Sequence, residues 1–203
     1  MQFADRTINE FLGDVAASTV TPSGGAVAAI GGASGAALCE MVCVHTIERD
    51  GSDDVRTELS DVRDELRARR VRLLELADED STAVDELQAA FEEPRDGDRA
   101  ELVRKASRRT VEAPLEIAEV CLAVLEAARV VTAKGNRNAV ADAGTGAFLA
   151  HSALRASVII VRSNLGLIED TAVVTSVEEC SAEIGTAADE AVEQVEENVA
   201  KAV

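Results

Sequence analysis

The chain has 203 residues, and its long stretches rich in alanine, glutamate, valine and leucine favour helices over short strands. No linker rich in Pro, Gly or Ser divides it, so we predict one all-α domain over residues 1–203. The formal net charge of −18 disfavours binding to nucleic acid or to an anionic membrane surface.

The first predicted helix covers residues 8–17. Thr7 and Glu10 have the S/T-x-x-E spacing of a capping box, which is typical of a helix start. Apolar residues follow at helical spacing. Pro22 and two glycines then interrupt the chain within residues 18–25, so the helix is expected to end there.

Two segments, 26–46 and 139–165, consist mostly of small apolar residues and are predicted to be the central helices of a bundle. The first is long enough for a membrane span, but it contains Glu40 and His45 and lacks positive flanks. Burial within a bundle or a dimer explains it better, so we expect no membrane association.

Three further segments have the apolar periodicity of long amphipathic helices, namely 54–91, 98–131 and 171–200. Pro114 is expected to bend the second of these or to start a new segment. A polar break at 92–97 and a loop at 134–138 separate the helices. In that loop, Gly135 is predicted to end the preceding helix in the left-handed conformation.

One charged residue interrupts the apolar stripe of the first long helix. Asp80 lies seven residues after Leu73 and seven before Leu87, where a leucine is expected. Charges stay out of protein cores unless they are paired or functional, and burial raises a carboxyl pKa towards neutrality. The sequence therefore predicts Asp80 as a catalytic acid and base, with a structural ion pair to Arg69 or Arg109 as the alternative.

Two loops containing glycine lead into the small-residue helices. Residues 21–25 read Thr-Pro-Ser-Gly-Gly, and residues 134–138 read Lys-Gly-Asn-Arg-Asn. Helix N-termini expose backbone N–H groups that attract carboxylates and electron-rich rings. By itself, however, the first loop is more typical of an ordinary turn with a helix cap.

Five segments, taken in order, resemble the C-terminal domain of the formiminotransferase-cyclodeaminase family, which includes cyclodeaminases and cyclohydrolases. They are residues 11–46, 78–84, 111–118, 135–142 and 161–165. Together they run through nearly the whole chain. No single motif among them is decisive, but their joint order is specific.

The resemblance implies a helical homodimer that binds a folate in a cleft bordered by the partner subunit, with no metal and no permanently bound cofactor. It implies hydrolysis of 5,10-methenyltetrahydrofolate to the 10-formyl compound, the activity that best suits a chain without a transferase domain. The alternatives are elimination of ammonia from 5-formiminotetrahydrofolate, or a non-catalytic folate-binding dimer.

The resemblance also assigns site residues. The catalytic carboxylate is Asp80 or Asp78. The residues matched to the motifs that line the folate site are Thr21, Pro22, Gly24, Gly25, Gly135, Asn136, Asn138, Asp142 and Asn164. The chain departs from the family pattern at Val20, Ser23, Ala26, Val84 and Ala141, with Ser23 standing where the family has a glycine.

The remaining polar residues carry weaker predictions. Arg104, Lys105, Arg108 and Arg109 form a basic helical face that suits either the glutamate tail of a folate or plain solvent. His45 and His151 are interpreted as core or interface residues, and the four cysteines as reduced core residues rather than metal ligands.

Charge and the N-terminus indicate the environment. Acidic residues number 38, and only three of the 20 basic residues are lysines, which indicates a halophilic protein whose self-repulsion is screened by salt. The chain does not begin with a basic segment followed by an apolar run, so a cytoplasmic location is predicted.

Overall fold

The computed structural model describes residues 2–49, 53–94 and 98–202, and it confirms the all-α class. The described residues contain no strand. Their α-helices are α1 (Ile8–Val15), α2 (Gly24–Arg49), α3 (Asp53–Glu92), α4 (Arg99–Lys134), α5 (Val140–Asn164) and α6 (Thr171–Ala202). Of the polar break predicted at 92–97, residues 95–97 lie outside the described residues.

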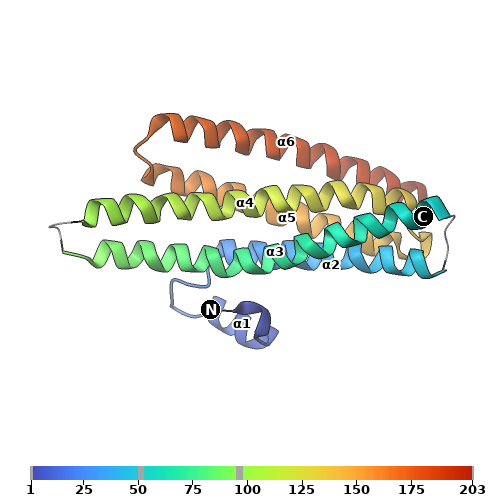
Figure 1. Cartoon of the computed structure of the whole chain (residues 1–203), viewed down its shortest axis with the longest axis horizontal. Helices are drawn as coiled ribbons and strands as arrows, with labels where there is room; N and C mark the ends of the chain where they lie inside the picture. Colours follow the sequence, from blue (N-terminus) through green and yellow to red (C-terminus); the bar gives the residue numbers. More distant parts are fainter. Residues whose placement is uncertain (1, 50–52, 95–97, 203) are drawn as a thin grey trace.

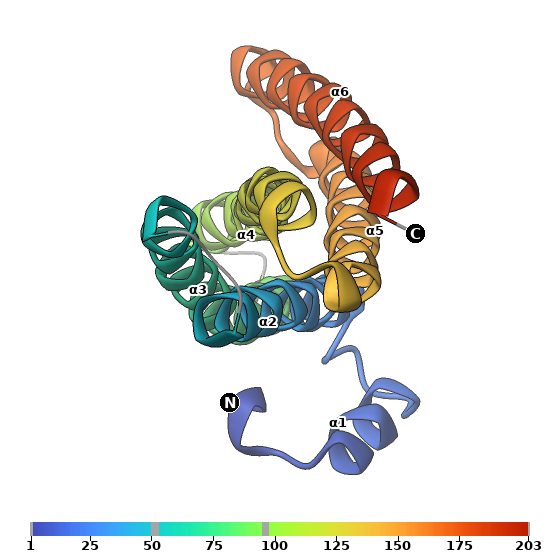
Figure 2. The same ribbon diagram turned by 90° about the vertical axis from the view of Figure 1, so that its right-hand side faces the viewer.

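Helices α2, α3, α4 and α5 form an antiparallel four-helix bundle. The long helices lie side by side along the longest axis of the molecule (Figure 1). In the end-on view, α2 packs against α3 and α5, and α4 packs against the same two helices (Figure 2). Helix α6 lies outside this group against α4 and α5.

Close approach of α2 and α5 depends on glycine. A methyl group on Gly35 would overlap the carbonyl oxygen of Gly146, and one on Gly146 would lie 2.6 Å from the carbonyl oxygen of Gly35. The two backbones therefore touch at this crossing, where no side chain fits between them.

Both small-residue helices meet the length and hydropathy of a membrane span. In α2 and in the segment 137–167, however, 56% and 50% of the apolar window is buried inside the bundle. The buried carboxylate of α2, Glu40, is 9% exposed and accepts hydrogen bonds from Arg67 Nε at 2.9 Å and Arg70 Nε at 3.0 Å. Protein therefore covers much of α2, and two cations from α3 neutralise its charge, as in the core helix of a bundle.

Pro114 lies inside one continuous helix, so the prediction that it starts a new segment is wrong. Proline has no N–H, which leaves the carbonyl of Thr110 without its usual partner one turn later in α4. Asn164 Nδ2, at the end of α5, donates to this carbonyl at 2.8 Å. A neighbouring helix thus replaces the lost hydrogen bond, and α4 continues.

Gly135 ends α4 in an extended rather than left-handed conformation, with φ −71° and ψ 170°, so that prediction is also wrong. Its N–H donates to the carbonyl of Val131 at 2.8 Å. A methyl group at this position would lie 2.5 Å from the carbonyl oxygen of Val131 and 3.0 Å from Val42 Cγ1 of α2. Glycine is needed here for close approach to the last turn of α4 and to α2 rather than for an unusual backbone angle.

Helix α1 stands away from the bundle (Figure 2). The predicted capping box is confirmed, since Thr7 Oγ1 accepts from Glu10 N–H and Glu10 Oε2 accepts from Thr7 N–H. Phe11 contacts Phe3 with ring centroids 5.4 Å apart, but Ile8 remains 78% exposed. The apolar face of α1 is thus only partly covered.

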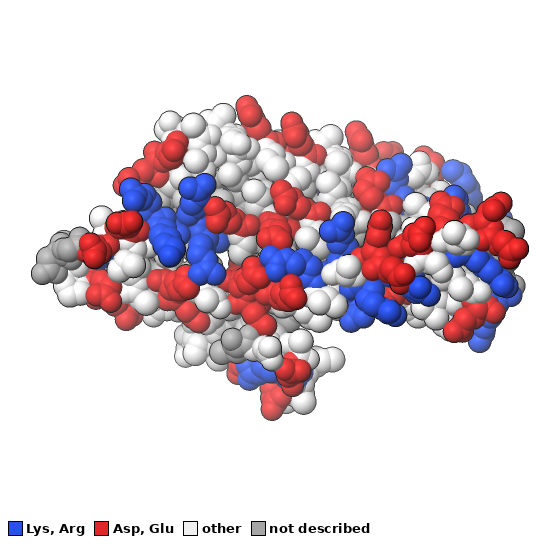
Figure 3. Space-filling view, viewed as in Figure 1, with Lys and Arg blue, Asp and Glu red and all other residues white. Residues whose placement is uncertain are grey.

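Charges of both signs are interspersed on the face formed by α3, α4 and α6 (Figure 3). Ion pairs link neighbouring helices there, including Arg109 with Glu86 and Lys134 with Glu58. Exposed pairs of this kind contribute little stability one by one. Their arrangement nevertheless places cations beside the excess of carboxylates on this face.

We predict that Gly35→Ala lowers the free energy of unfolding by about 1–3 kcal/mol, because the added methyl group must push α5 away from α2. Chemical denaturation measures the loss. Gly13→Ala is the control, since nothing lies within 4 Å of a methyl group at Gly13. Equal stability of the two variants would contradict the close helix crossing.

Candidate active site

The carboxylate of Asp80 lies at the N-terminus of α2. Only 2% of the residue is exposed. Ser23 Oγ donates a hydrogen bond to Asp80 Oδ2 at 3.3 Å, and the backbone N–H of Ala26 donates another. The N-terminal end of a helix carries a partial positive charge, so this position suits a carboxylate. The buried face of α3 thus places the Asp80 carboxylate at the start of α2.

Gly25 makes room for that carboxylate. A methyl group on Gly25 would overlap both carboxylate oxygens of Asp80. The side chain of Asp80 therefore lies directly over the backbone of α2, in space that any other residue at position 25 would fill. Glycine at position 25 and aspartate at position 80 form one packing unit.

Burial raises the pKa of the Asp80 carboxyl above its usual range, because water no longer solvates the charged form. The hydrogen bonds from Ser23 and Ala26 oppose this shift. Within residues 2–49, 53–94 and 98–202, no Lys or Arg forms an ion pair with Asp80, and Arg109 pairs instead with Glu86 at 2.5 Å. The alternative of an ion pair with Arg69 or Arg109 is therefore absent from the structure.

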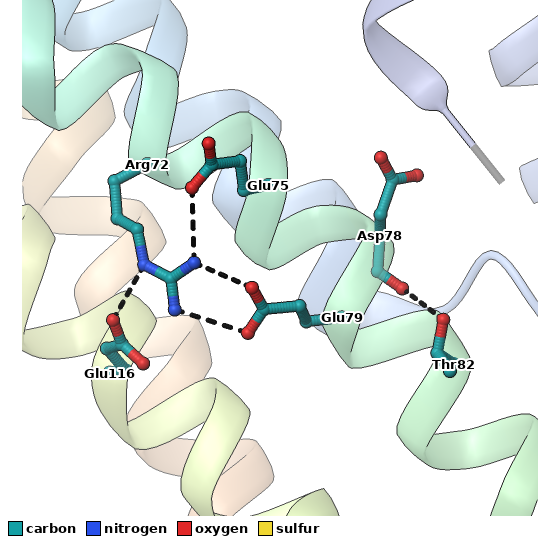
Figure 4. Close-up of polar contacts among 6 residues, drawn as sticks. All are labelled: Arg72, Glu75, Asp78, Glu79, Thr82 and Glu116. Carbon is teal, nitrogen blue, oxygen red and sulfur yellow. Dashed lines mark hydrogen bonds and ion pairs between the residues drawn. The ribbon is translucent and has the colours of Figure 1, made fainter.

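Asp78 faces a different part of the molecule. Its Oδ1 accepts a hydrogen bond from the backbone N–H of Phe3 at 3.1 Å. In Figure 4 its carboxylate points away from the cluster in which Arg72 binds three glutamates. Those glutamates are Glu75, Glu79 and Glu116. Asp78 therefore anchors the N-terminal segment to α3, while Asp80 lies beneath the start of α2.

A groove of about 560 Å³ lies beside the Asp80 carboxylate. Its walls come from the 19–24 loop, the first turns of α2 and the middle of α5. Such a volume lies within the range of small-molecule sites. Residues that line it include Val20, Pro22, Ser23, Gly24, Leu149 and Ser152. Asp80 lies behind this wall, and Ser23 touches both the groove and the carboxylate.

Five of the predicted binding residues belong to this end of the bundle. Pro22 and Gly24 line the groove, Gly25 supports Asp80, and Thr21 Oγ1 donates to Asp85 Oδ1 at 2.8 Å. Asn164 ends α5 nearby, where its amide nitrogen is already bound to the carbonyl of Thr110. The interactions of Thr21 and Asn164 with α3 and α4 thus shape the walls of this end.

The other four predicted residues, Gly135, Asn136, Asn138 and Asp142, lie at the opposite end of α2. The backbone N–H of Asn136 donates to Thr46 Oγ1 at 2.8 Å, in the last turns of α2. Along α2, Thr46 is about 30 Å from Gly25 at the rise of an α-helix. A single chain therefore does not bring the two predicted loops together.

Ser23 is the site residue that sequence reasoning missed. The sequence marked it only as a departure from the family pattern, because a serine before two glycines is typical of a helix cap. Its contact with Asp80 joins residues 57 positions apart in the chain. Local spacing carries no signal for such a contact.

Two residues of the predicted basic face form ion pairs, and three of the four cysteines are buried. Arg108 pairs with Glu112 at 2.8 Å, and Arg109 pairs with Glu86. Cys39, Cys43 and Cys121 are free and buried, and burial raises the pKa of each thiol to about 12. In the part of the chain that the structure describes, no three His, Cys, Asp or Glu side chains form a group that fits a metal ion.

We predict that Gly25→Ala destabilises the fold by about 1–3 kcal/mol because its methyl group displaces the Asp80 carboxylate. The cost is expected to shrink when Asp80→Ala is combined with it, since alanine vacates that space. A double-mutant cycle in urea measures this coupling. Additive effects of the two substitutions would show that the two residues do not share one space.

Comparison with known proteins gives a consistent result. The sequence model of the formiminotransferase-cyclodeaminase family matches residues 7–183. A methenyltetrahydrofolate cyclohydrolase of Methylorubrum extorquens is 34% identical over 173 residues, which cover 83% of each chain. The crystal structure of a formiminotetrahydrofolate cyclodeaminase from Thermotoga maritima has the same fold, with a TM-score of 0.91, 24% identity and 98% of each chain covered. The chain therefore belongs to the formiminotransferase-cyclodeaminase family.

Proposed function

We propose that this protein is a methenyltetrahydrofolate cyclohydrolase, which hydrolyses 5,10-methenyltetrahydrofolate to 10-formyltetrahydrofolate. The observation that carries the proposal is the buried Asp80 carboxylate, held beside a groove at the start of α2 without a cationic partner among the described residues. The 34% identity to the Methylorubrum extorquens cyclohydrolase supports hydrolysis as the reaction.

The reaction needs a group that both accepts and returns a proton. The bridge carbon of the substrate is an amidinium carbon, and addition of water to it gives a neutral tetrahedral adduct once a base has taken a proton. Collapse of the adduct breaks the bond to N5, which must then be protonated. A carboxyl group whose pKa is raised by burial can act as this base and then as the acid.

Charge also favours Asp80 for this substrate. The methenyl bridge carries a positive charge, and an ionised carboxylate in a site with little water attracts it more strongly than an exposed one would. Because Asp80 has no cation beside it in the described part of the chain, its charge remains available to the substrate. The reaction needs no metal and no permanently bound cofactor.

We further propose that two subunits complete each folate site. The Gly135–Asp142 region lies at one end of the antiparallel pair α2 and α5, and the Asp80 groove lies at the other. A partner related by a two-fold axis across this pair would place its Gly135–Asp142 region beside the first subunit's groove. The same axis would form a second identical site.

The exposed side of α2 and α5 suits such pairing. In a chain with a net charge of −18, this side carries a run of uncharged residues from both helices. The exposed members are Val27, Ser34, Thr145, Phe148, Leu149, Ser152 and Ile159. Ile159 is 68% exposed and Phe148 is 46% exposed. An uncharged, largely apolar surface of this length is typical of an interface between subunits.

The proposal also covers the cellular location of the enzyme and the salt concentration around it. One-carbon folate chemistry of this kind fits a cytoplasmic protein of one domain. The excess of carboxylates over cations fits a cell with a salty interior, where screening reduces repulsion between the carboxylates.

We predict that Asp80→Asn lowers turnover of 5,10-methenyltetrahydrofolate by about a hundredfold or more while substrate binding is retained, because asparagine cannot accept and return the proton. Loss of the near-ultraviolet absorbance of the substrate measures turnover. Since the base must be ionised and burial raises its pKa, wild-type activity should fall with decreasing pH above the usual range of an Asp carboxyl. This acid limb should be absent from Asp80→Asn.

Asp78→Asn makes the same chemical change two residues away. It tests whether Asp80 or Asp78 is the base. Its effect on turnover should be only a few-fold, because Asp78 binds the backbone of Phe3. A larger loss in Asp78→Asn than in Asp80→Asn would identify Asp78 as the base. If wild-type protein leaves the methenyl compound unchanged but releases ammonia from 5-formiminotetrahydrofolate, the enzyme is a cyclodeaminase.

We predict complementation between two inactive variants. Asp80→Asn and Asp142→Ala should each be inactive as homodimers, whereas a heterodimer purified through two different tags contains one intact site and should have about half of the wild-type activity. The absorbance assay measures this recovery. A heterodimer as inactive as its parents, or a monomer in solution, would contradict a site shared between subunits.

A further inference from the structure

We propose that the hydroxyl group of Ser23 relays protons between Asp80 and the substrate in the groove. This inference rests on the proposed cyclohydrolase activity and adds a second reacting group to it. It follows from the position of Ser23, which forms part of the groove wall and at the same time donates to Asp80 Oδ2 at 3.3 Å.

The carboxylate needs such a relay because it lies behind the wall of the groove. Asp80 is 2% exposed, and the backbone of Gly25 covers its oxygens. Pro22 and Gly24, which also line the groove beside Ser23, have no side-chain group that can transfer a proton. The Ser23 hydroxyl is thus the group of this loop that connects the groove to the buried acid.

The hydrogen bonds at the start of α2 leave Ser23 available for this role. The carbonyl of Ser23 accepts from Val27 N–H at 3.2 Å, so Ser23 occupies the N-cap position. A serine there usually accepts from the backbone N–H three residues later, which is that of Ala26. In this protein Asp80 accepts that N–H, and the Ser23 hydroxyl donates to Asp80. The oxygen of Ser23 can therefore accept a proton from the groove.

The protons and bonds balance over one turnover of the relay. As the oxygen of water bonds to the bridge carbon, one water proton passes to Ser23 Oγ while the Ser23 proton passes to Asp80. On collapse of the adduct, Asp80 returns its proton to Ser23, and Ser23 protonates N5 as the bond from N5 to the bridge carbon breaks. The adduct hydroxyl loses its proton to solvent and becomes the formyl oxygen. Methenyl cation and water thus give the formyl compound and one proton.

Three variants of the full-length protein test this role. Ser23→Ala removes the hydroxyl and keeps the β-carbon as a methyl group, so kcat should fall about 10- to 100-fold with KM changed less than threefold. Ser23→Gly leaves a space that a water molecule can occupy and bridge, so its kcat should exceed that of Ser23→Ala about tenfold. Ser176→Ala, which removes an exposed hydroxyl from α6, is the control and should match wild type.

A double variant separates a relay from a serine that only hydrogen-bonds to Asp80, and the pH profile tests the hydrogen bond itself. Loss of the Ser23 hydrogen bond should move the acid limb of kcat/KM to higher pH, because that bond favours the ionised form of Asp80. Ser23→Ala combined with Asp80→Asn should be no slower than Asp80→Asn alone, since both lie on one proton path.

The outcomes are distinct. If the wild-type protein turns over the substrate and Ser23→Ala has the same kcat and pH profile, the relay is overturned. It is also overturned if Ser23→Ala and Ser23→Gly lose equal activity and the effects of Ser23→Ala and Asp80→Asn add in the double variant. A wild-type protein without hydrolase activity instead overturns the proposed function. Thermal melts of every variant establish that the compared proteins are folded, and Ser23→Gly retains the test if Ser23→Ala does not fold.

Discussion

The position of the Asp80 carboxylate against the N-terminus of α2 is the interaction on which the rest of the site depends. It requires an aspartate within an apolar stripe of α3, a glycine at position 25 and backbone N–H groups at the start of α2. Burial makes the charged form costly, while the helix end and the Ser23 hydroxyl stabilise it. A carboxyl group under these opposing influences can exchange a proton with a nearby reactant.

The antiparallel bundle has a second consequence. It places the two glycine-containing loops at opposite ends of α2, about 30 Å apart along the helix. A folate site that uses both loops therefore needs a second subunit, which is why we propose that the uncharged side of α2 and α5 forms an interface. Helix α1, which stands away from the bundle with Ile8 exposed, has an apolar face that such a partner could also cover.

Buried polar groups in this fold are satisfied by neighbouring helices. Asn164 of α5 donates to the Thr110 carbonyl that Pro114 leaves unbonded in α4, and two arginines of α3 neutralise Glu40 of α2. Both arrangements lock adjacent helices in register, because moving either helix by one turn would break them.

The sequence by itself determined the all-α class, the order of the helices, the capping box at Thr7 and the burial of Asp80. These features follow from local spacing. Apolar periodicity shows which face of a helix is buried and whether an acidic residue lies on that face. Family resemblance added the candidate binding residues and the reaction. Sequence patterns also misled at Gly135, where the expected left-handed turn does not occur, and at Pro114, where no new segment starts.

Only the tertiary structure decided what each buried group touches. It separated Asp80 from Asp78, linked Ser23 to a carboxylate 57 residues away, gave Asn164 a partner in α4 and placed the two loops apart. The physical reason is that a hydrogen bond or a close backbone approach between helices depends on how those helices pack. The periodicity within one helix says which side faces inward, but not which atoms lie across from it.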